Sequence, residues 1–205
     1  MVVMQLTALT RGRYRVDMED QTAFVLYQTE LAGLDIREGE NVPEETLRKI
    51  REEILPLRAK KRVLNLLQRK DYTSAQLRGK LREGDYPESC IEEAVAYAAS
   101  YGYVDDGRYA EDFIRYHLEK KSRTRIEQDL MKKGISKDLI GGIFEKLAEE
   151  GTAQDEESMI RDLLQKKNYD KRTATGQEKQ KMYAFLYRKG FHAEAIRKAL
   201  LLDIT

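Results

Sequence analysis

The fold of this chain is decided by residues 123–144, whose sequence is RTRIEQDLMKKGISKDLIGGIF. The segment contains two apolar pairs at helical spacing, Ile126 with Leu130 and Ile140 with Phe144. Residues four apart lie on one face of a helix, so each pair predicts an amphipathic helix. Gly134 stands between the pairs and is the residue type that ends helices in a left-handed conformation. The segment therefore predicts two helices joined by a tight turn.

The same apolar pattern occurs in two other parts of the chain. An alignment without gaps, at steps of 49 and 56 residues, superposes three apolar sets: Leu77, Leu81, Tyr86, Ile91 and Val95; Ile126, Leu130, Ile135, Ile140 and Phe144; Met182, Leu186, Phe191, Ile196 and Leu200. Asp85, Gly134 and Gly190 share the position just before the third apolar residue. Agreement at apolar and turn positions together indicates internal duplication.

Each copy is expected to form three helices. The first helices are predicted at 58–70, 105–121 and 155–168, the second at 73–83, 123–133 and 176–189, and the third at 87–100, 136–149 and 192–201. Such short helices are stable only when their apolar faces pack together. The third copy is seven residues longer, which we assign to a loop around residues 169–176. We expect a mainly α protein of tandem three-helix repeats in an elongated array, with repeats at 58–104, 105–153 and 154–205.

Residues 1–57 are predicted to form a small β-rich N-terminal unit with a connecting helix. Strands are expected at 2–9, 14–18 and 22–27, where β-branched and aromatic residues are separated by turn signals. The helix is expected to start near Pro43 and to reach Leu55, with Pro56 at its end or at a kink.

Composition excludes several classes of protein. No apolar run approaches the ~20 residues that span a bilayer, and the first residues do not resemble a signal peptide. Cys90 is the only cysteine, so no internal disulfide forms, and a cytoplasmic location is expected. The net charge of +1 conceals separate regions, which sum to −4 over 1–57, +6 over 58–70, −7 over 71–157 and +6 over 158–205. Opposed regions of this kind suit a charged partner.

Catalytic patterns are sparse. The chain has no glycine-rich phosphate loop, and its two histidines, His117 and His192, do not form a zinc motif with Cys90. Asp105 and Asp106 precede an apolar-periodic helix, where carboxylates cap the N-terminus. We therefore expect no enzyme activity, no catalytic residues, no cofactor and no metal.

Basic residues of the second helices are the candidate partner-binding positions. The second and third repeats share four of them, pairing Arg123 with Lys179, Arg125 with Lys181, Lys132 with Arg188 and Lys133 with Lys189. The first repeat has Arg78, Lys80 and Arg82 instead. Cations near a helix C-terminus also complement the helix dipole, and charged runs are often solvated faces. That explanation does not cover Arg123 and Arg125, which lie near the N-terminal end, so a repeated basic face for phosphates or acidic protein surfaces is a hypothesis.

Three segments resemble one known family. The stretches RKDYTSAQLRGKL at 69–81, GYVDDGRYA at 102–110 and RTRIEQDLMKKGI at 123–135 resemble the RecX regulatory proteins of bacteria. The resemblance implies tandem three-helix units and no catalytic residues. It also implies a modulator that lies in the groove of the RecA recombinase filament on single-stranded DNA. Such proteins mostly inhibit RecA ATPase, strand-exchange and co-protease activities, which places them in DNA repair, recombination and the SOS response.

The resemblance has departures, and other functions stay open. Family members often have glycine where Lys121 and Ser122 stand, and the third repeat diverges, so filament contact is expected in the second repeat more than in the third. The alternative function is a helix-turn-helix-like DNA-binding protein, although Glu127 and Asp129 mix acids into the candidate recognition helix. A general protein-interaction solenoid is the third hypothesis. A monomer with RecA filament and nearby single-stranded DNA as partners is expected.

Overall fold

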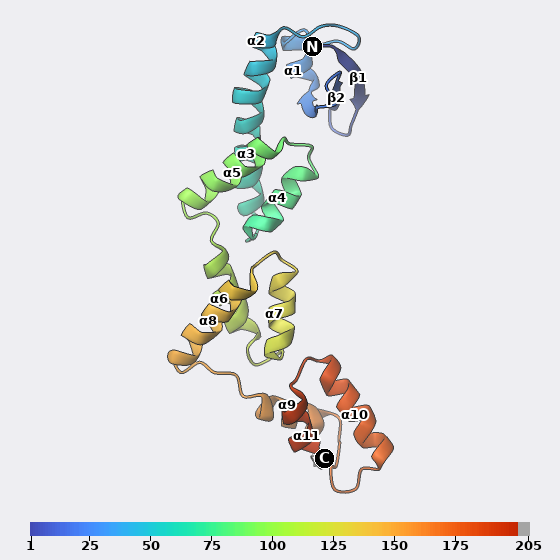
Figure 1. Cartoon of the computed structure of the whole chain (residues 1–205), viewed down its shortest axis with the longest axis vertical. Helices are drawn as coiled ribbons and strands as arrows, with labels where there is room; N and C mark the ends of the chain where they lie inside the picture. Colours follow the sequence, from blue (N-terminus) through green and yellow to red (C-terminus); the bar gives the residue numbers. More distant parts are fainter. Residues whose placement is uncertain (201–205) are drawn as a thin grey trace. The chain divides into compact units, whose positions relative to one another are not determined.

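The protein is mainly α-helical, with a small three-stranded antiparallel sheet at its N-terminus (Figure 1). The computed structural model describes residues 1–200, and the chain forms two compact units, Met1–Asp105 and Asp106–Thr205. The predicted fold class is thereby confirmed. The last residue of the helix predicted at 192–201, and the last five of the repeat predicted at 154–205, lie outside the described residues.

The sheet of the first unit contains the three predicted strands in sequence order. They are β1 (Val3–Ala8), β2 (Arg13–Met18) and β3 (Ala23–Tyr27). Both β1 and β3 pair antiparallel with the central strand β2. Three consecutive residues of β3 are buried, because the short helix α1 (Gln28–Gly33) and the long helical segment that follows cover this part of the sheet.

The connecting helix does not end at Leu55. Helix α2 (Glu44–Lys49), the π-helical segment η1 (Ile50–Ile54) and α3 (Leu55–Leu67) follow one another without a break, so Pro56 lies inside a continuous helix. Proline lacks an N–H and its ring clashes with the carbonyl four residues earlier. The wider π turn just before Pro56 accommodates both effects. The predicted end of this helix at Leu55 was wrong.

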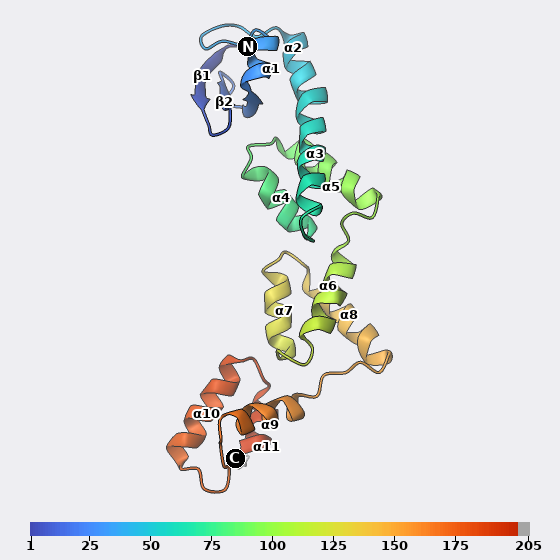
Figure 2. The same ribbon diagram turned by 180° about the vertical axis from the view of Figure 1, so that it is seen from behind.

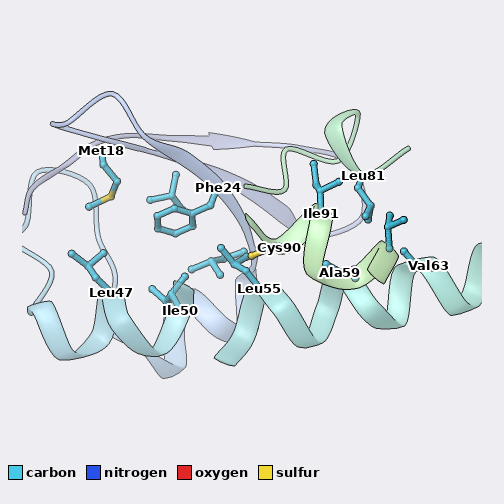
Figure 3. Close-up of a cluster of buried hydrophobic side chains, with 14 of the residues drawn as sticks. Met18, Phe24, Leu47, Ile50, Leu55, Ala59, Val63, Leu81, Cys90 and Ile91 are labelled. Carbon is cyan, nitrogen blue, oxygen red and sulfur yellow. The ribbon is translucent and has the colours of Figure 1, made fainter. Parts of the chain in front are cut away.

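One hydrophobic core joins the sheet to the first repeat. Met18 and Phe24 of the sheet face Leu47, Ile50 and Leu55 of the long helix in Figure 3. Farther along the same helix, buried residues of α4 (Ser74–Arg82) and α5 (Glu88–Ser100) pack against α3. The boundary predicted between residues 57 and 58 therefore falls inside α3 and inside one continuous core. The division into four domains stays a proposal.

The second unit contains two groups of three helices, visible from behind in Figure 2. The first group is α6 (Asp106–His117), α7 (Arg123–Met131) and α8 (Lys137–Glu149), and the second is α9 (Glu156–Lys166), α10 (Gly176–Arg188) and α11 (Ala193–Leu200). Each group encloses its own cluster of buried side chains. Of the fifteen apolar residues that define the repeat, all are buried except Tyr86 and Met182, which are partly buried against a core.

Turn and cap residues act as the repeat predicts. Gly134 and Gly190 have φ values of +84° and +86°, and Asp85 occupies the same position in the first repeat with φ +55°. Capping boxes begin α4 at Thr73 and α10 at Thr175. Arg15 Nη1 of β2 also donates a hydrogen bond to Asp85 Oδ1 at 2.8 Å, an ion pair that links the sheet to the first repeat.

The seven extra residues of the third repeat lengthen a helix as well as a loop. Helix α10 has 13 residues, whereas the corresponding α7 has 9, and residues 167–175 connect α9 to α10. The second helix predicted at 176–189 agrees with this longer α10, and the loop around residues 169–176 accounts for only part of the insertion. Thr175 and Glu178 build a new capped turn onto the N-terminus of α10, which extends the surface of this helix.

A buried hydroxyl joins the second repeat to the third. Ser122 Oγ donates to the Lys189 carbonyl oxygen at 2.6 Å and accepts from the Arg125 N–H at 3.4 Å. Gly190 lies so close that a Cβ there would be 2.7 Å from Ser122 Oγ. The N-terminus of α7 therefore packs directly against the C-terminus of α10.

Candidate partner interface

The predicted basic residues of the first repeat are neutralised by acids of the same repeat. Arg78 forms two hydrogen bonds with Glu92, at 2.7 and 2.9 Å, and Arg82 pairs in the same two-pronged way with Glu88. The hydrogen bond from Arg78 holds the pKa of Glu92 below its usual range. Lys80 pairs with Glu83 at 2.7 Å. These cations are occupied within the fold and are poorly placed to bind a separate anion.

The second repeat is partly neutralised. Arg123 pairs with Glu127 at 2.8 Å, and Arg125 pairs with Asp129 at 3.4 Å, each one helical turn away. Asp129 also accepts a hydrogen bond from Lys121 Nζ at 2.9 Å. Burial alone would raise the pKa of Asp129, but this hydrogen bond and the nearby positive charges lower it.

The two remaining basic positions of the second repeat differ from each other. The Lys132 side chain is exposed and has no hydrogen bond or ion pair within residues 1–200. Lys133 lies 5.6 Å from the ring centroids of both Tyr109 and Phe113.

Three candidate basic residues of the third repeat lack an ion pair within residues 1–200, although Lys198 of the same repeat pairs with Glu157 at 2.5 Å. The side chains of Lys179, Lys181 and Arg188 form no ion pair within residues 1–200. Lys189 Nζ lies 5.3 Å from the Phe185 ring centroid. The only acid of α10 is Glu178, which is used in the capping box with Thr175; the hydrogen bonds from Thr175, and then the charge of Lys181, lower its pKa. The basic residues available to a partner therefore concentrate in the third repeat.

The basic run at 58–70 is also partly internal. Arg58 Nη1 donates to the Val25 carbonyl at 2.7 Å and pairs with Glu30 at 3.1 Å, while Lys60 pairs with Glu93 at 2.7 Å. Arg58 thus fastens α3 to the sheet. The structure brings these residues into the fold of the first unit, which a charge count along the chain does not reveal.

A basic cleft lies between the second and third repeats within the second unit. Its volume is about 540 Å³, and its charged lining comprises the acids Glu119 and Asp162 and the bases Lys120, Lys121, Arg125, Lys166, Arg188 and Lys189. Only Arg125, Arg188 and Lys189 were among the predicted site residues. The others come from the α6–α7 loop and from the end of α9, and only packing of the two repeats places them beside α10.

Aromatic rings of α6 lie against Lys120 and Lys121, two residues that line this cleft. Along α6, Phe113 and Tyr116 contact His117, with ring centroids 4.3 and 4.8 Å away. Lys120 Nζ lies 3.5 Å from the Tyr116 ring centroid. Burial and the positive charges of Lys121 and Lys120 lower the pKa of His117. Its buried Nδ1 has no hydrogen-bond partner within the described residues.

The described residues offer no metal centre. Among residues 1–200, no group of three or more His, Cys, Asp or Glu side chains could hold a metal ion. Cys90 is buried, and burial raises the pKa of its thiol. No helix in this part of the chain is long and apolar enough to cross a membrane. The absence of enzyme activity stays a prediction.

Family models match the chain at each of the three repeats. Their descriptions are the first, second and third three-helix domains of RecX, and they cover residues 59–97, 105–141 and 155–200. The matches coincide with the repeats found from apolar spacing.

Curated relatives span nearly the whole chain and share one name. "Regulatory protein RecX" of Caldanaerobacter subterraneus subsp. tengcongensis is 33% identical over 192 residues, which are 93% of each chain. The protein of that name from Clostridium beijerinckii is 25% identical over 211 residues, covering 100% of this chain and 97% of the relative.

Two solved structures have a similar fold. The crystal structure of a regulatory protein RecX aligns with a TM-score of 0.62 at 22% identity and covers 98% of this chain and 99% of its own. RecX from Lactobacillus salivarius aligns with a TM-score of 0.58 at 21% identity, over 74% of this chain and 99% of its own. With three matching domains and a relative of 33% identity over almost its full length, the chain belongs to the RecX family.

Proposed function

We propose that this protein binds the RecA recombinase filament on single-stranded DNA. When bound to the filament, it lowers the ATPase, strand-exchange and co-protease activities of RecA. The observation that carries the proposal is the series of three RecX-type repeats in a family whose relatives are named regulators. A role in the control of recombination, repair and the SOS response follows, with a cytoplasmic monomer as the acting form.

The repeated architecture suits a filament, because a filament presents the same surface many times. Each repeat linked to its neighbour binds at a high effective concentration, so contacts that are weak singly add to a useful affinity. The basic residues of the third repeat that have no ion pair within residues 1–200, together with those that line the cleft, give the protein positive charge that attracts a negatively charged nucleoprotein filament.

A helix-turn-helix-like reader of duplex DNA is less well supported. In such proteins the N-terminal residues of the recognition helix contact base edges. Here Arg123 and Arg125, at the start of α7, are each paired with an acid one turn later. Binding to DNA would have to break both pairs.

The proposal is tested by the DNA-dependent ATPase of the cognate recombinase. Adding the protein at substoichiometric to equimolar ratios is expected to lower the rate of ATP hydrolysis, and co-sedimentation is expected to find the protein on filaments. An unchanged ATPase together with no binding to filaments would contradict the proposal.

Contact through the second repeat is tested separately. Replacing Arg123, Arg125, Lys132 and Lys133 with Glu is expected to weaken filament binding while the far-ultraviolet circular dichroism stays unchanged. Unaltered binding by this variant would assign these four residues to a solvated helix face.

A further inference from the structure

Helix α10 differs from its counterparts in what accompanies its cations. In α7 the basic residues are followed four positions later by acids, giving the pairs Arg123–Glu127 and Arg125–Asp129. The repeat alignment places Lys179 and Lys181 at the same two basic positions of α10, and Tyr183 and Phe185 at the two acidic positions. The third repeat has thus exchanged two charge-neutralising acids for two aromatic rings.

The tyrosines of α10 form a stacked pair. The rings of Tyr183 and Tyr187 are nearly parallel, with an interplanar angle of 10° and centroids 6.1 Å apart. Tyr183 packs partly against the core of the third repeat, which holds its ring in place. Tyr187 lies one turn farther along, and 61% of its surface is exposed. A fixed ring therefore supports an exposed one.

Cations flank this pair on the side of α10 that faces away from its core. We define the outer face of α10 by six positions on the side opposite the buried Leu186, which are Gln177, Gln180, Lys181, Ala184, Tyr187 and Arg188; all are exposed except the half-buried Ala184. None of these six residues is acidic, although the exposed Glu178 lies close enough to Lys181 for the lysine to help lower the pKa of the Glu178 carboxyl, after the hydrogen bonds from Thr175. Neither Lys181 nor Arg188 has a side-chain hydrogen bond or ion pair within residues 1–200. Arg188 also lines the basic cleft.

Aromatic rings beside unneutralised cations match the chemistry of an unpaired nucleic-acid strand. A base stacks on an exposed ring through its π-face, and the phosphates are attracted by the adjacent positive charges. In a duplex the base faces are covered by neighbouring bases, so only a single strand can use the ring. An acidic protein surface would use the cations but would gain little from the tyrosines.

We propose that the outer face of α10 binds single-stranded nucleic acid directly. Unpaired bases stack on Tyr187, which Tyr183 supports, and the phosphates lie against Lys181 and Arg188. This inference deepens the proposed function, because it names the repeat and the chemistry through which the protein contacts the strand. It moves the expected contact from the second repeat to the third.

The test measures binding to two fluorescent probes without recombinase. One probe is an oligothymidylate, and the other is an abasic strand of the same length, which has the same charge and no bases. The full-length protein is expected to bind the oligothymidylate about fivefold or more tightly than the abasic strand, since stacking adds to phosphate attraction. Equal affinities, or no binding to either probe at low salt, would overturn the inference.

Substitutions separate stacking from charge. We expect Tyr187→Ala to lower the affinity for oligothymidylate about five- to tenfold and to leave the affinity for the abasic strand unchanged. Tyr187→Met, which introduces the residue found at this position in the second repeat, is expected to have the same effect. The double variant Lys181→Gln, Arg188→Gln is expected to bind both probes more weakly and to show a smaller salt dependence of binding. Thermal unfolding of each variant verifies that the fold is kept.

Tyr101→Ala is the matched control. Tyr101 is 62% exposed and stacks on Tyr103, so it resembles Tyr187 in exposure and ring contact but lies in the first unit. The control variant is expected to bind as the unmodified protein does. An equal loss of affinity in both variants would overturn the assignment to α10. Because recombinase is absent, the result is independent of whether the protein lowers ATPase activity.

Discussion

At the scale of single residues, glycine is required where a turn and a neighbouring side chain meet. Gly190 has φ +86°, and a Cβ there would lie 2.7 Å from Ser122 Oγ. Gly151 has a similar φ of +80°, but no atom lies within 4 Å of its Cβ position. The two glycines therefore share backbone strain and differ in steric contact.

Gly190→Ala is expected to destabilise the protein more than Gly151→Ala does. A non-glycine residue in this conformation costs about 1–2 kcal/mol, which both variants incur. Only the first must also displace Ser122 and its hydrogen bond to the Lys189 carbonyl. Urea denaturation of the two variants measures the difference. Equal losses would show that the contact between α7 and α10 contributes nothing to stability.

His117 makes stability depend on pH. Burial, Lys121 and Lys120 lower its pKa, with a further contribution from Lys133 and an opposing one from Asp129. The folded protein thus favours the neutral ring, whereas the unfolded chain takes up a proton as pH falls through about 6.5. The free energy of unfolding is therefore expected to decrease as pH falls below about 6.5.

The variant His117→Gln is expected to weaken this pH dependence between pH 6.5 and 5. His192→Gln, which changes the other histidine, is the control and is expected to retain it. Denaturation with urea across this pH range measures the effect. An unchanged profile in His117→Gln would contradict the role of the buried ring.

At the scale of helices, side-chain caps fix where the repeat elements begin. Thr73 is fully buried, its Oγ1 accepts a hydrogen bond from the Gln76 N–H at 3.2 Å, and Gln76 Oε1 accepts one from the Thr73 N–H at 3.1 Å. Thr175 and Glu178 form the same arrangement at an exposed site on α10. Two capping boxes of the same kind therefore differ in burial.

Thr73→Ala is expected to cost about 1–2 kcal/mol of stability. Thr175→Ala is expected to cost less, because water can satisfy the amides that it leaves exposed. Thr73→Ser keeps the hydroxyl and should recover most of the loss. Chemical denaturation provides the comparison. If Thr73→Ala and Thr73→Ser were equally destabilising, the lost methyl group rather than the cap would be responsible.

At the scale of the whole molecule, the distribution of usable charge differs from the distribution of charged residues. The chain contains 37 basic and 36 acidic residues, but the first repeat pairs its second-helix cations internally and the third does not. Salt bridges on the surface contribute little to stability, yet they occupy cations that a polyanion would otherwise contact. The third repeat is therefore the end of the chain best suited to a charged partner.

Neutralising the third repeat is expected to impair filament binding more than neutralising the first. Lys181→Gln with Arg188→Gln should raise the protein concentration needed for half-maximal ATPase inhibition several-fold, because it removes unneutralised charges. Arg78→Gln with Arg82→Gln removes the same number of charges and should change inhibition little. Equal effects of the two double variants would contradict this ranking of the repeats.

Much of the fold could be predicted because it depends on local patterns. The spacing of Leu77 and Leu81 and of their counterparts determines a buried helix face, and Gly134 and Gly190 determine the turns. The candidate site was less predictable. Whether Arg78 is available depends on Glu92, which belongs to the next helix, and the lysines of the cleft meet only when two repeats pack together.

The sequence by itself determined the mainly helical class, the three repeats and the caps, because apolar period and turn chemistry act over a few residues. It did not determine that the helix passes through Pro56, since a π turn and packing against the sheet offset the cost of proline there. Only the tertiary structure decided that Arg78 and Arg82 are neutralised, because their partners Glu92 and Glu88 belong to the next helix. By that criterion we expect the third repeat, rather than the second, to present the charge that binds a partner.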